Sequence, residues 1–459
     1  MLAAHSNPGE LPVPIQPIEP SATPPASPLR RLTSYLATHP IGFWFIFWGE
    51  LAERSSYYGM RAILTLYMIN ELGFEEGHAS SVMGYFIAGC YILPLVGGYL
   101  ADNHFGKYWT IVGFSLPYIL GHYLLGIESV VFLTIALSLL AMGSGVIKPN
   151  ISTLMGMTYD QQRPGQERLR SDAFAIFYGA INIGAALSSF AMPLLRERYG
   201  YAIAFLFPAG LMVLAFGFFA AGKPFYAREV IVRAKTTPEY RAQRWRVLLR
   251  LLGLFLVVGF FWAIFDQSPS TWTIFAKDHL DLNLLGHQFQ PDQLQAINPV
   301  LIVILLPVVT VGWRVCARFG LHLKPTDKML IGFVLTTLTM AIMAAAGFLA
   351  GQEGKVSMMW EVAAYLLITI AEICISVVGL ELAFTAAPKS MKSFVTACWL
   401  LTVSFGNLGN AWFTPYYETL QPGPFFAVLA LVMVPVSVIF LLVARQFNRA
   451  TASQDAETS

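Results

Sequence analysis

The sequence predicts an all-α integral membrane protein whose chain crosses the bilayer about twelve times. Hydrophobic residues make up 56% of the 459 residues and charged residues only 12%, whereas roughly 25% of residues are charged in an ordinary soluble domain. The apolar runs are long and continuous. This indicates spanning helices, because the strands of a membrane barrel are short and alternate in polarity.

Twelve apolar runs have about the 20 residues that a spanning helix needs. They cover residues 42–69, 79–101, 108–126, 129–156, 174–195, 202–221, 248–276, 296–317, 328–350, 359–384, 394–413 and 425–446. The longest polar interval separates the first six from the last six. A plan of two six-helix bundles is that of major-facilitator-type transporters, in which the substrate site lies between the halves near the bilayer midplane.

The same pattern predicts five parts of the chain. They are a disordered Pro-rich cytoplasmic tail (1–38), an N-terminal six-helix bundle (39–221), a cytoplasmic linker (222–246), a C-terminal six-helix bundle (247–446) and a cytoplasmic tail (447–459). The first part is rich in proline and has no apolar run, so we expect neither a signal peptide nor a packed core there.

The distribution of Lys and Arg predicts the orientation of the chain. Loops on one side, such as 163–170 and 223–246, are basic, whereas loops on the other side, such as 71–78, are acidic or mixed. Only Arg196 and Arg198 break this pattern. Because basic loops stay in the cytoplasm, we expect both termini there, in a multi-pass protein of the plasma (inner) membrane.

The loop after the second run resembles the loop that major facilitators carry between their second and third helices. In this chain it reads from Gly98 to Lys107 and contains Asp102 and Gly106. We expect Asp102 to end one helix, Gly106 to allow a tight turn and Lys107 to begin the next helix. An ordinary turn is the alternative interpretation.

The first run carries four ionisable residues and two tyrosines on one helical face. These residues are Glu50, Glu53, Arg54, Tyr57, Tyr58 and Arg61. Four separate charges at membrane depth would together cost about 10–14 kcal/mol, so they must face one another, other helices or water. Glu50 and Arg54 lie one turn apart and can pair. The alternative is an inert ion network that locks helix packing.

Among the charged residues of the later runs, Lys148, Asp266 and Glu372 are further candidates. An ammonium in an apolar helix needs a carboxylate partner, which Glu50, Glu53 or a ligand could supply. The alternatives are a lysine that extends toward the membrane surface, an aspartate in a loop and an inert buried glutamate.

Several uncharged residues join these candidates. Asn182 lies on a stripe with Phe174 and Tyr178 that could also be a helix contact. Asn298 precedes a proline, and as an alternative its sole role could be to satisfy the backbone groups that the proline frees. Trp399 could be plain core.

Six motifs resemble those of the proton-dependent oligopeptide transporter family, in the same order. The stretch from Glu50 to Gly59 is similar to the first-helix signature Glu-x-x-Glu-Arg-Phe-x-Tyr-Tyr-Gly, except that Ser55 replaces Phe. The other five are Gly143 to Asn150, Phe174 to Leu187, Trp262 to Gln267, Gln295 to Pro299, and Glu372 with Ser376 and Gly379.

The resemblance implies proton-coupled symport of di- and tripeptides into the cytoplasm by alternating access. Arg54, Arg61 and Lys148 would bind the peptide carboxylate, and Glu372, with Asn182 and Asn298, the amine. The aromatic pockets for side chains would be formed by Tyr57, Tyr58, Tyr91, Trp262 and Trp399. The proton-coupling and gating salt bridges would involve Glu50, Glu53, Arg54, Lys148, Arg61 and Asp266.

Some positions depart from the family pattern and leave an alternative open. Ala371 replaces the Gly that commonly precedes the tenth-helix Glu, and Gly84 stands where animal members have a His. The alternative is a proton-coupled carrier of another small solute, such as a modified amino acid, nitrate or a drug, on the same fold.

An enzyme is not expected, because the eight histidines show no metal-ligand spacing. The four cysteines, at Cys90, Cys316, Cys374 and Cys398, show no pairing pattern and are expected to be packing residues. We expect no metal or cofactor, with protons as the coupling ion. The partners would be a short peptide and the lipid bilayer but no nucleic acid, and the chain would function as a monomer.

Overall fold

Long helices make up most of the chain from Ile41 onward. The computed structural model describes residues 35–229, 238–386 and 392–458. The fold is that of the described residues from Pro40 onward. Its first half contains α2 (Ile41–Asn70), α3 (Glu76–Leu100), the π-turn η1 (Ala101–Phe105), α4 (Gly106–Leu124), α5 (Val130–Gln162), α6 (Glu167–Ala221) and the short 3₁₀ helix η2 (Lys223–Phe225).

The second half alternates long helices with short breaks. Its helices are α7 (Pro238–Phe265), η3 (Ser268–Trp272), α8 (Thr273–His279), η4 (Pro291–Ala296), α9 (Ile297–Arg318), α10 (Pro325–Ala350), α11 (Met359–Glu372), η5 (Ile373–Val377), α12 (Val378–Ala386), α13 (Lys392–Phe413), α14 (Tyr416–Leu420) and α15 (Pro422–Thr458). Two-residue strands lie in the loops. β1 (Leu280–Asp281) pairs in parallel with β4 (Val356–Ser357), and β2 (Asn283–Leu284) pairs antiparallel with β3 (His287–Gln288).

Each of the twelve predicted spans coincides with helical segments of the structure to within a few residues. In the described residues, eight helical stretches are long and apolar enough to cross a membrane, and two of them, Glu76–Leu124 and Glu167–Ala221, each contain two of the predicted spans. The two predicted spans outside these eight stretches are in α2, which carries four charges, and α13, which carries Asn407 and Asn410.

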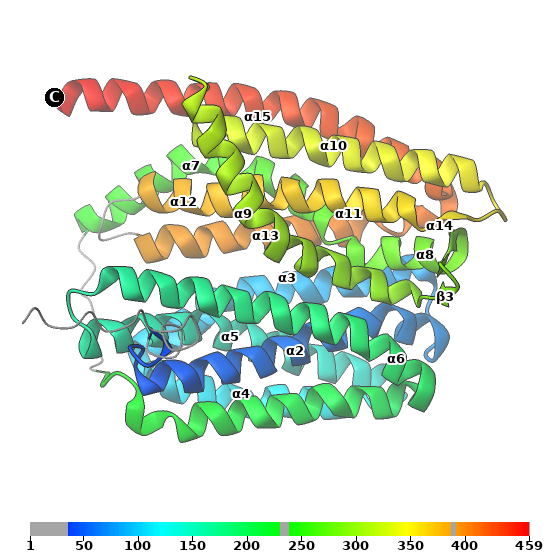
Figure 1. Cartoon of the computed structure of the whole chain (residues 1–459), viewed down its shortest axis with the longest axis horizontal. Coiled ribbons are helices and arrows are strands. Elements are labelled where there is room, and N and C mark those ends of the chain that lie inside the picture. The colour runs from blue at the N-terminus through cyan, green and yellow to red at the C-terminus, as the bar shows by residue number, and fades with distance from the viewer. Residues whose placement is uncertain (1–34, 230–237, 387–391, 459) are drawn as a thin grey trace, which may run out of the picture. The chain divides into compact units, whose positions relative to one another are not determined.

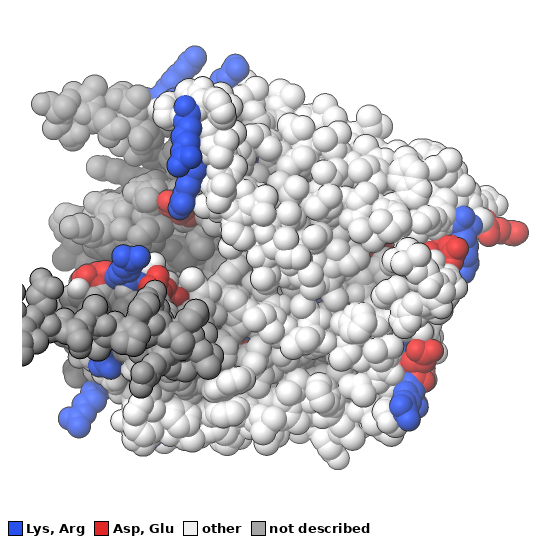
Figure 2. Space-filling model, in the orientation of Figure 1, with Lys and Arg blue, Asp and Glu red and all other residues white. Residues whose placement is uncertain are grey.

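The charged residues gather toward the two ends of the visible face of the molecule. Figure 2 shows Lys, Arg, Asp and Glu at both ends and a broad band between them that is almost free of these side chains. Many large apolar side chains are exposed to the surroundings, among them Trp109, Leu187 and Trp412. A surface of this kind suits a hydrocarbon environment better than water.

Buried hydrophobic residues form two clusters, one in each half of the chain. The first draws its residues from α2 to α6 and the loop after α6, and the second from α7 to α15. Helices α3 and α13 join the halves and lie side by side in Figure 1. Tyr91 and Ile69 pack against both clusters. The polar residues described below lie near this junction.

Gly200, with a φ of 79° and a ψ of 169°, breaks the helical backbone of α6 between the fifth and the sixth predicted spans. The boundaries differ from the expected ones at two places. Helix α7 begins at Pro238, inside the segment expected to be the linker. Helix α15 continues to Thr458 through the expected tail.

The loop between α3 and α4 has the turn that its sequence predicts. Gly106 has a φ of 77°, and the Lys107 ammonium pairs with the Asp102 carboxylate. The Glu229 carboxylate, from the linker, accepts hydrogen bonds from the backbone N–H groups of Lys107 and Tyr108. The linker therefore caps the first turn of α4, where the N–H groups lack helical partners.

Candidate functional site

Three charged residues of α2 form a buried ion network within one helix. The Arg54 Nε lies 3.3 Å from the Glu50 carboxylate and also pairs with the Glu53 carboxylate. All three side chains are at most 3% exposed. Each carboxylate retains one oxygen without a hydrogen-bond partner in the described part of the chain, so this network is only partly satisfied.

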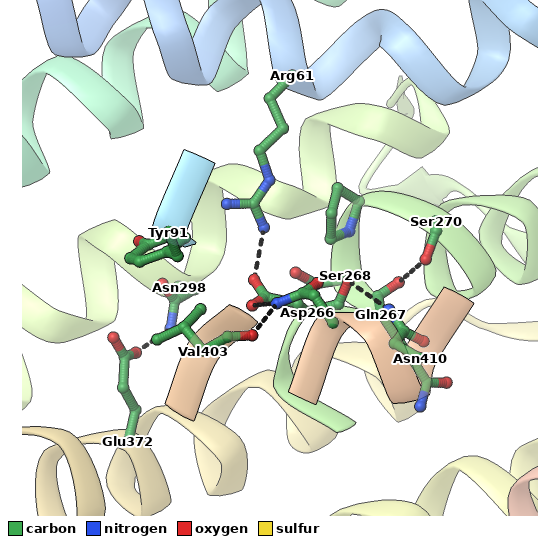
Figure 3. A network of polar contacts seen from close by, with 12 residues as sticks. Arg61, Tyr91, Asp266, Gln267, Ser268, Ser270, Asn298, Glu372, Val403 and Asn410 are labelled. Carbon is green, nitrogen blue, oxygen red and sulfur yellow. Dashed lines mark hydrogen bonds and ion pairs between the residues drawn. The ribbon is translucent and has the colours of Figure 1, made fainter. Parts of the chain in front are cut away.

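A second ion pair joins α2 to the end of α7. The Arg61 Nη2 lies 3.1 Å from the Asp266 Oδ1 (Figure 3). The other Asp266 oxygen accepts a 2.7 Å hydrogen bond from the Asn407 side chain, and Asn410 donates a longer bond of 3.4 Å to the Asp266 carbonyl. Three helices, α2, α7 and α13, therefore meet at one carboxylate.

A second carboxylate lies beside this pair on α11. The Asn298 amide, at the start of α9, donates to the Glu372 Oε2 at 2.8 Å and to the Thr369 hydroxyl at 3.1 Å (Figure 3). No positively charged side chain pairs with Glu372 among the described residues. Its carboxylate can therefore accept a cationic group from outside the protein.

Lys148 faces this region from α5, but its partner is not the expected carboxylate. The Lys148 ammonium donates a 2.9 Å hydrogen bond to the Tyr91 hydroxyl and lies 4.1 Å from the centre of the same ring. In the described residues it makes no ion pair. A half-buried cation held only by a phenol can bind an anionic group.

The tyrosines of α2 lie against its arginines. The Arg54 guanidinium is 5.6 Å from the centre of the Tyr57 ring, and the Arg61 guanidinium is 5.9 Å from that of Tyr58. These cation–π contacts help to hold the two guanidinium groups in place. The tyrosines therefore position the cations.

The remaining predicted residues contact other groups of the protein. The Trp262 indole donates a 3.1 Å bond to the Thr402 hydroxyl, and the Asn182 amide donates a 3.0 Å bond back to the Tyr178 carbonyl of its own helix. The Trp399 ring lies against Gly379, where a Cβ atom would fall 2.1 Å from the ring. Trp399 is therefore buried against Gly379, which leaves room for its ring.

Ser55, where the family motif has Phe, is part of a helix contact. Its hydroxyl donates a 2.7 Å bond to the Leu51 carbonyl and lies where a Cβ on Gly184 would approach to 2.8 Å. A larger side chain on either helix would separate α2 from α6.

Both site carboxylates stand immediately before a break in their helices. The π-turn η3 begins two residues after Asp266, and η5 begins directly after Glu372. A π-turn frees backbone groups and redirects the chain, and such turns are frequent at functional sites. Asp266 and Glu372 therefore both lie where a regular helix ends.

Two functional candidates were not predicted from the sequence. Asn407 is fully buried and holds the Asp266 carboxylate. Arg196, an exception to the charge pattern, lies 2.9 Å from the buried Asp292 carboxylate and so joins α6 to η4. The exceptional position of Arg196 was itself a signal that it has a specific partner.

Comparison with known proteins finds a matching family. The family model described as the POT family matches residues 108–239 and 228–422. Solute carrier family 15 member 2 of Mus musculus is 31% identical over 70% of the chain, and solute carrier family 15 member 1 of Homo sapiens is 31% identical over 67%. The chain spans about half the length of these mammalian relatives, 51% and 52% respectively.

Other relatives match almost end to end. The transporter YclF of Bacillus subtilis (strain 168) is 28% identical over 90% of this chain and 95% of its own. The crystal structure of the POT family transporter PepTSo has a TM-score of 0.81 at 29% identity, over 90% of this chain and 99% of its own. That of the peptide transporter POT in complex with sulfate has a TM-score of 0.80 at 25% identity, over 90% and 96%.

The comparisons also account for the helical architecture. The matched structures are those of membrane transporters, and the similarity includes both halves of this chain. Together with the apolar helices, it makes the chain a multi-pass helical membrane protein of the major-facilitator type. The family model covers well over half of the sequence, and the chain belongs to the POT family.

Proposed function

We propose that this protein is a proton-coupled symporter that carries di- and tripeptides into the cytoplasm by alternating access. Family membership supports a transporter rather than an enzyme, and one similar structure is that of a peptide transporter. The observation that carries the proposal is the separation of charge. The unpaired cation Lys148 lies in the N-terminal half, and the unpaired carboxylate Glu372 lies in the C-terminal half.

A short peptide at neutral pH is a zwitterion whose two charged ends are a nearly fixed distance apart while its side chains vary. In the proposed complex, Lys148 binds the carboxylate, supported by Arg54 and Arg61. Glu372 binds the amine, next to the Asn298 amide that already holds one of its oxygens. A simple anion would use only the first of these two groups.

The side chains of different peptides would be accepted through contact with apolar and aromatic surface rather than through hydrogen bonds. Tyr58 and Tyr91 are half-buried and therefore offer free aromatic surface, whereas Tyr57 and Trp262 are buried. Asn182, whose amide bonds to its own helix, would contribute its carbonyl oxygen.

Proton coupling would arise at the ion pairs. A carboxylate paired with arginine holds a proton less tightly than the same carboxylate left unpaired in a dry site. If the Arg61–Asp266 pair closes the outer side and separates when the halves move, proton affinity must change with conformation, and linkage makes the reverse true. Glu50, Glu53 and Asp266 are the proposed proton carriers.

The finer topology is part of the same proposal. Both termini would lie in the cytoplasm of a cell bounded by the plasma (inner) membrane, so that the loops that contain β1 and β4 face outward. The chain would function as a monomer in the lipid bilayer. Protons are the coupling ion, and no cofactor is needed.

Uptake of labelled dialanine by vesicles that contain the purified protein tests the proposal. We expect accumulation that depends on an inward proton gradient and exceeds that of protein-free vesicles. Unlabelled dialanine should compete with the label, whereas nitrate should not. The absence of uptake both with and without the gradient would refute peptide transport.

The Glu372→Gln variant tests the assignment of the amine site. In this variant, unlabelled dialanine should no longer compete with labelled dialanine. The melting temperature should equal that of the wild type, because the carboxamide can still accept the hydrogen bond from Asn298. A peptide flux equal to that of the wild type would show that the amine binds elsewhere.

A further inference from the structure

An apolar groove lies on the exposed face of α4, in the part of the helix next to the linker. It has a volume of about 370 Å³ and is lined by Phe105, Trp109, Gly113, Phe114 and Pro117. The side chains of Phe105 and Trp109 are 52% and 57% exposed. Among the described residues, therefore, no neighbouring helix covers this face.

A glycine between two rings gives the groove its shape. A Cβ atom added to Gly113 would meet no atom within 4 Å. Trp109 lies one turn before this glycine and Pro117 one turn after it, so the groove runs along the helix axis. The distance from Trp109 to Pro117 is about 12 Å at 1.5 Å per residue, which is less than the thickness of about 15 Å of one hydrocarbon leaflet. One acyl chain can therefore lie along the groove.

A cation lies at the linker end of this groove. The Lys223 ammonium is 4.2 Å from the centre of the Trp109 ring and 5.1 Å from the centre of the Tyr108 ring. Trp109 therefore belongs to both the groove and the cation contact. Lys223 is exposed, and it makes no ion pair within the part of the chain that the structure describes. Its N–H donors remain available to an anion.

The helix η2, which carries Lys223, is attached to the N-terminal bundle. The Phe225 ring stacks on the Phe45 ring of α2, with the centroids 5.6 Å apart and the planes at 7°. The Gln162 amide of α5 donates a 2.8 Å hydrogen bond to the Phe225 carbonyl. These contacts, two residues from Lys223, keep the ammonium beside Trp109 before any ligand binds.

The surroundings of the groove indicate which molecules can reach it. The same face of α4 continues with Leu116 and Leu120, which are 57% and 49% exposed. An apolar face of this kind lies in hydrocarbon, whereas Trp109 and Lys223 are typical of the membrane–water interface. A phospholipid has an apolar chain for the groove and a phosphate for the ammonium. An anionic headgroup fits better than a zwitterionic one, which carries a cation of its own.

We propose that this groove binds one anionic phospholipid, with an acyl chain along Trp109, Gly113 and Pro117 and the phosphate at Lys223. In the proposed topology this lipid belongs to the cytoplasmic leaflet. Affinity comes from packing and charge, because the chain is in hydrocarbon whether it is bound or free. One lysine at a membrane surface favours an anionic over a zwitterionic lipid about fivefold. The site is separate from the peptide site and does not depend on the proposed transport.

Native mass spectrometry of the full-length protein tests the headgroup preference. In detergent that contains equal amounts of dioleoyl phosphatidylglycerol and dioleoyl phosphatidylcholine, the first lipid retained by the wild type should be the anionic one, by about fivefold. Lys223→Gln should abolish this preference. Arg168→Gln, which removes an exposed positive charge from α6, is the control and should keep it. Equal retention of the two lipids by the wild type, or an unchanged preference in Lys223→Gln, would overturn the proposal.

A phosphatidylglycerol with a photoactivatable group in its acyl chain tests the position of the site. Cross-links in the wild type should map to residues 105–117. Gly113→Leu fills the groove and should reduce these cross-links about as strongly as Lys223→Gln. Gly210→Leu is the matched control, since a Cβ atom on this exposed glycine of α6 also meets no atom within 4 Å, and it should leave them unchanged.

Both leucine variants should fold, because leucine favours a helix more than glycine does. If Gly113→Leu nevertheless melts far below the wild type, the cross-links of the wild type and of Lys223→Gln still decide the site. Cross-links that map only outside residues 105–117, or that are equally strong in the wild type and Lys223→Gln, would refute a lipid site in this groove.

Discussion

Two buried ion networks on α2 differ in what they join. Arg54 pairs with Glu50 and Glu53 of the same helix, whereas Arg61 pairs with Asp266, 205 residues away at the end of α7. When the halves of a transporter move as rigid bodies, distances within one helix stay fixed. Distances between α2 and α7 do not.

The difference separates stability from conformational change. The network within α2 keeps its three partners together in every state, so its removal should damage the fold in all of them. The Arg61–Asp266 pair can exist in one state and separate in another, so its removal should change the balance between states. Each prediction below tests one side of this distinction.

The largest effect is expected from Arg54→Met. The substitution leaves the carboxylates of Glu50 and Glu53 buried without a cation, and loss of one partner of a buried pair costs about 3–5 kcal/mol. We expect a large fall in the melting temperature of the detergent-solubilised protein and loss of all transport modes. Arg198→Met, which removes an exposed arginine near Tyr199, is the control and should melt like the wild type. Equal melting of the two variants would contradict the stabilising role.

Asp266→Asn should reduce transport more than stability. The carboxamide can still accept the bond from Asn407, and Arg61 remains 11% exposed to water, so the melting temperature should fall less than in Arg54→Met. Without a titratable group at this position, gradient-driven uptake should fall by about a hundredfold while counterflow persists. A variant that still accumulates dialanine against a gradient would exclude Asp266 from coupling.

A smaller shift between states is expected from Asp292→Asn. This substitution weakens the second pair that joins the halves, since Arg196 lies on α6 and Asp292 on η4. If the pair stabilises one state by about 1.4 kcal/mol, its loss shifts the ratio of the two states about tenfold. Spin labels at the exposed positions Glu128 and Leu285, in a chain with its four cysteines replaced by serine, should report a larger population of long distances. An unchanged distance distribution would limit Asp292 to a local role.

The network within α2 was predictable from the sequence for a simple reason. Four ionisable residues of one apolar helix must share a face, and the helical period alone places Glu50 next to Arg54. The partner of Arg61 could not be derived from spacing, because Asp266 belongs to another helix. Family resemblance placed both residues among those expected to form gating salt bridges, and the structure contains the contact.

Other contacts could not be predicted from the sequence. Asn407 carries no charge and lies in an otherwise apolar helix, so nothing distinguished it from a residue that satisfies backbone groups. Asp292 lies at the edge of a polar interval and was not distinguished from ordinary loop acids, yet the fold buries it completely. Lys148 required a polar partner, but only the packing of α3 against α5 shows that this partner is Tyr91. Such choices depend on tertiary contacts that no local pattern encodes.

The smallest effect is expected from Asp160→Asn, which tests whether burial distinguishes the two networks on α2 from ordinary ion pairs. Asp160 pairs with Arg170 near the connection between α5 and α6, and these side chains are 58% and 37% exposed. An exposed pair contributes at most about 1 kcal/mol, because water and salt screen it. Melting temperature and uptake should therefore match the wild type within error, at low and at high salt. A loss as large as that of Arg54→Met would mean that charge pairing stabilises this protein regardless of burial, and the distinction between fixed and separable pairs would no longer explain the difference between Arg54 and Arg61.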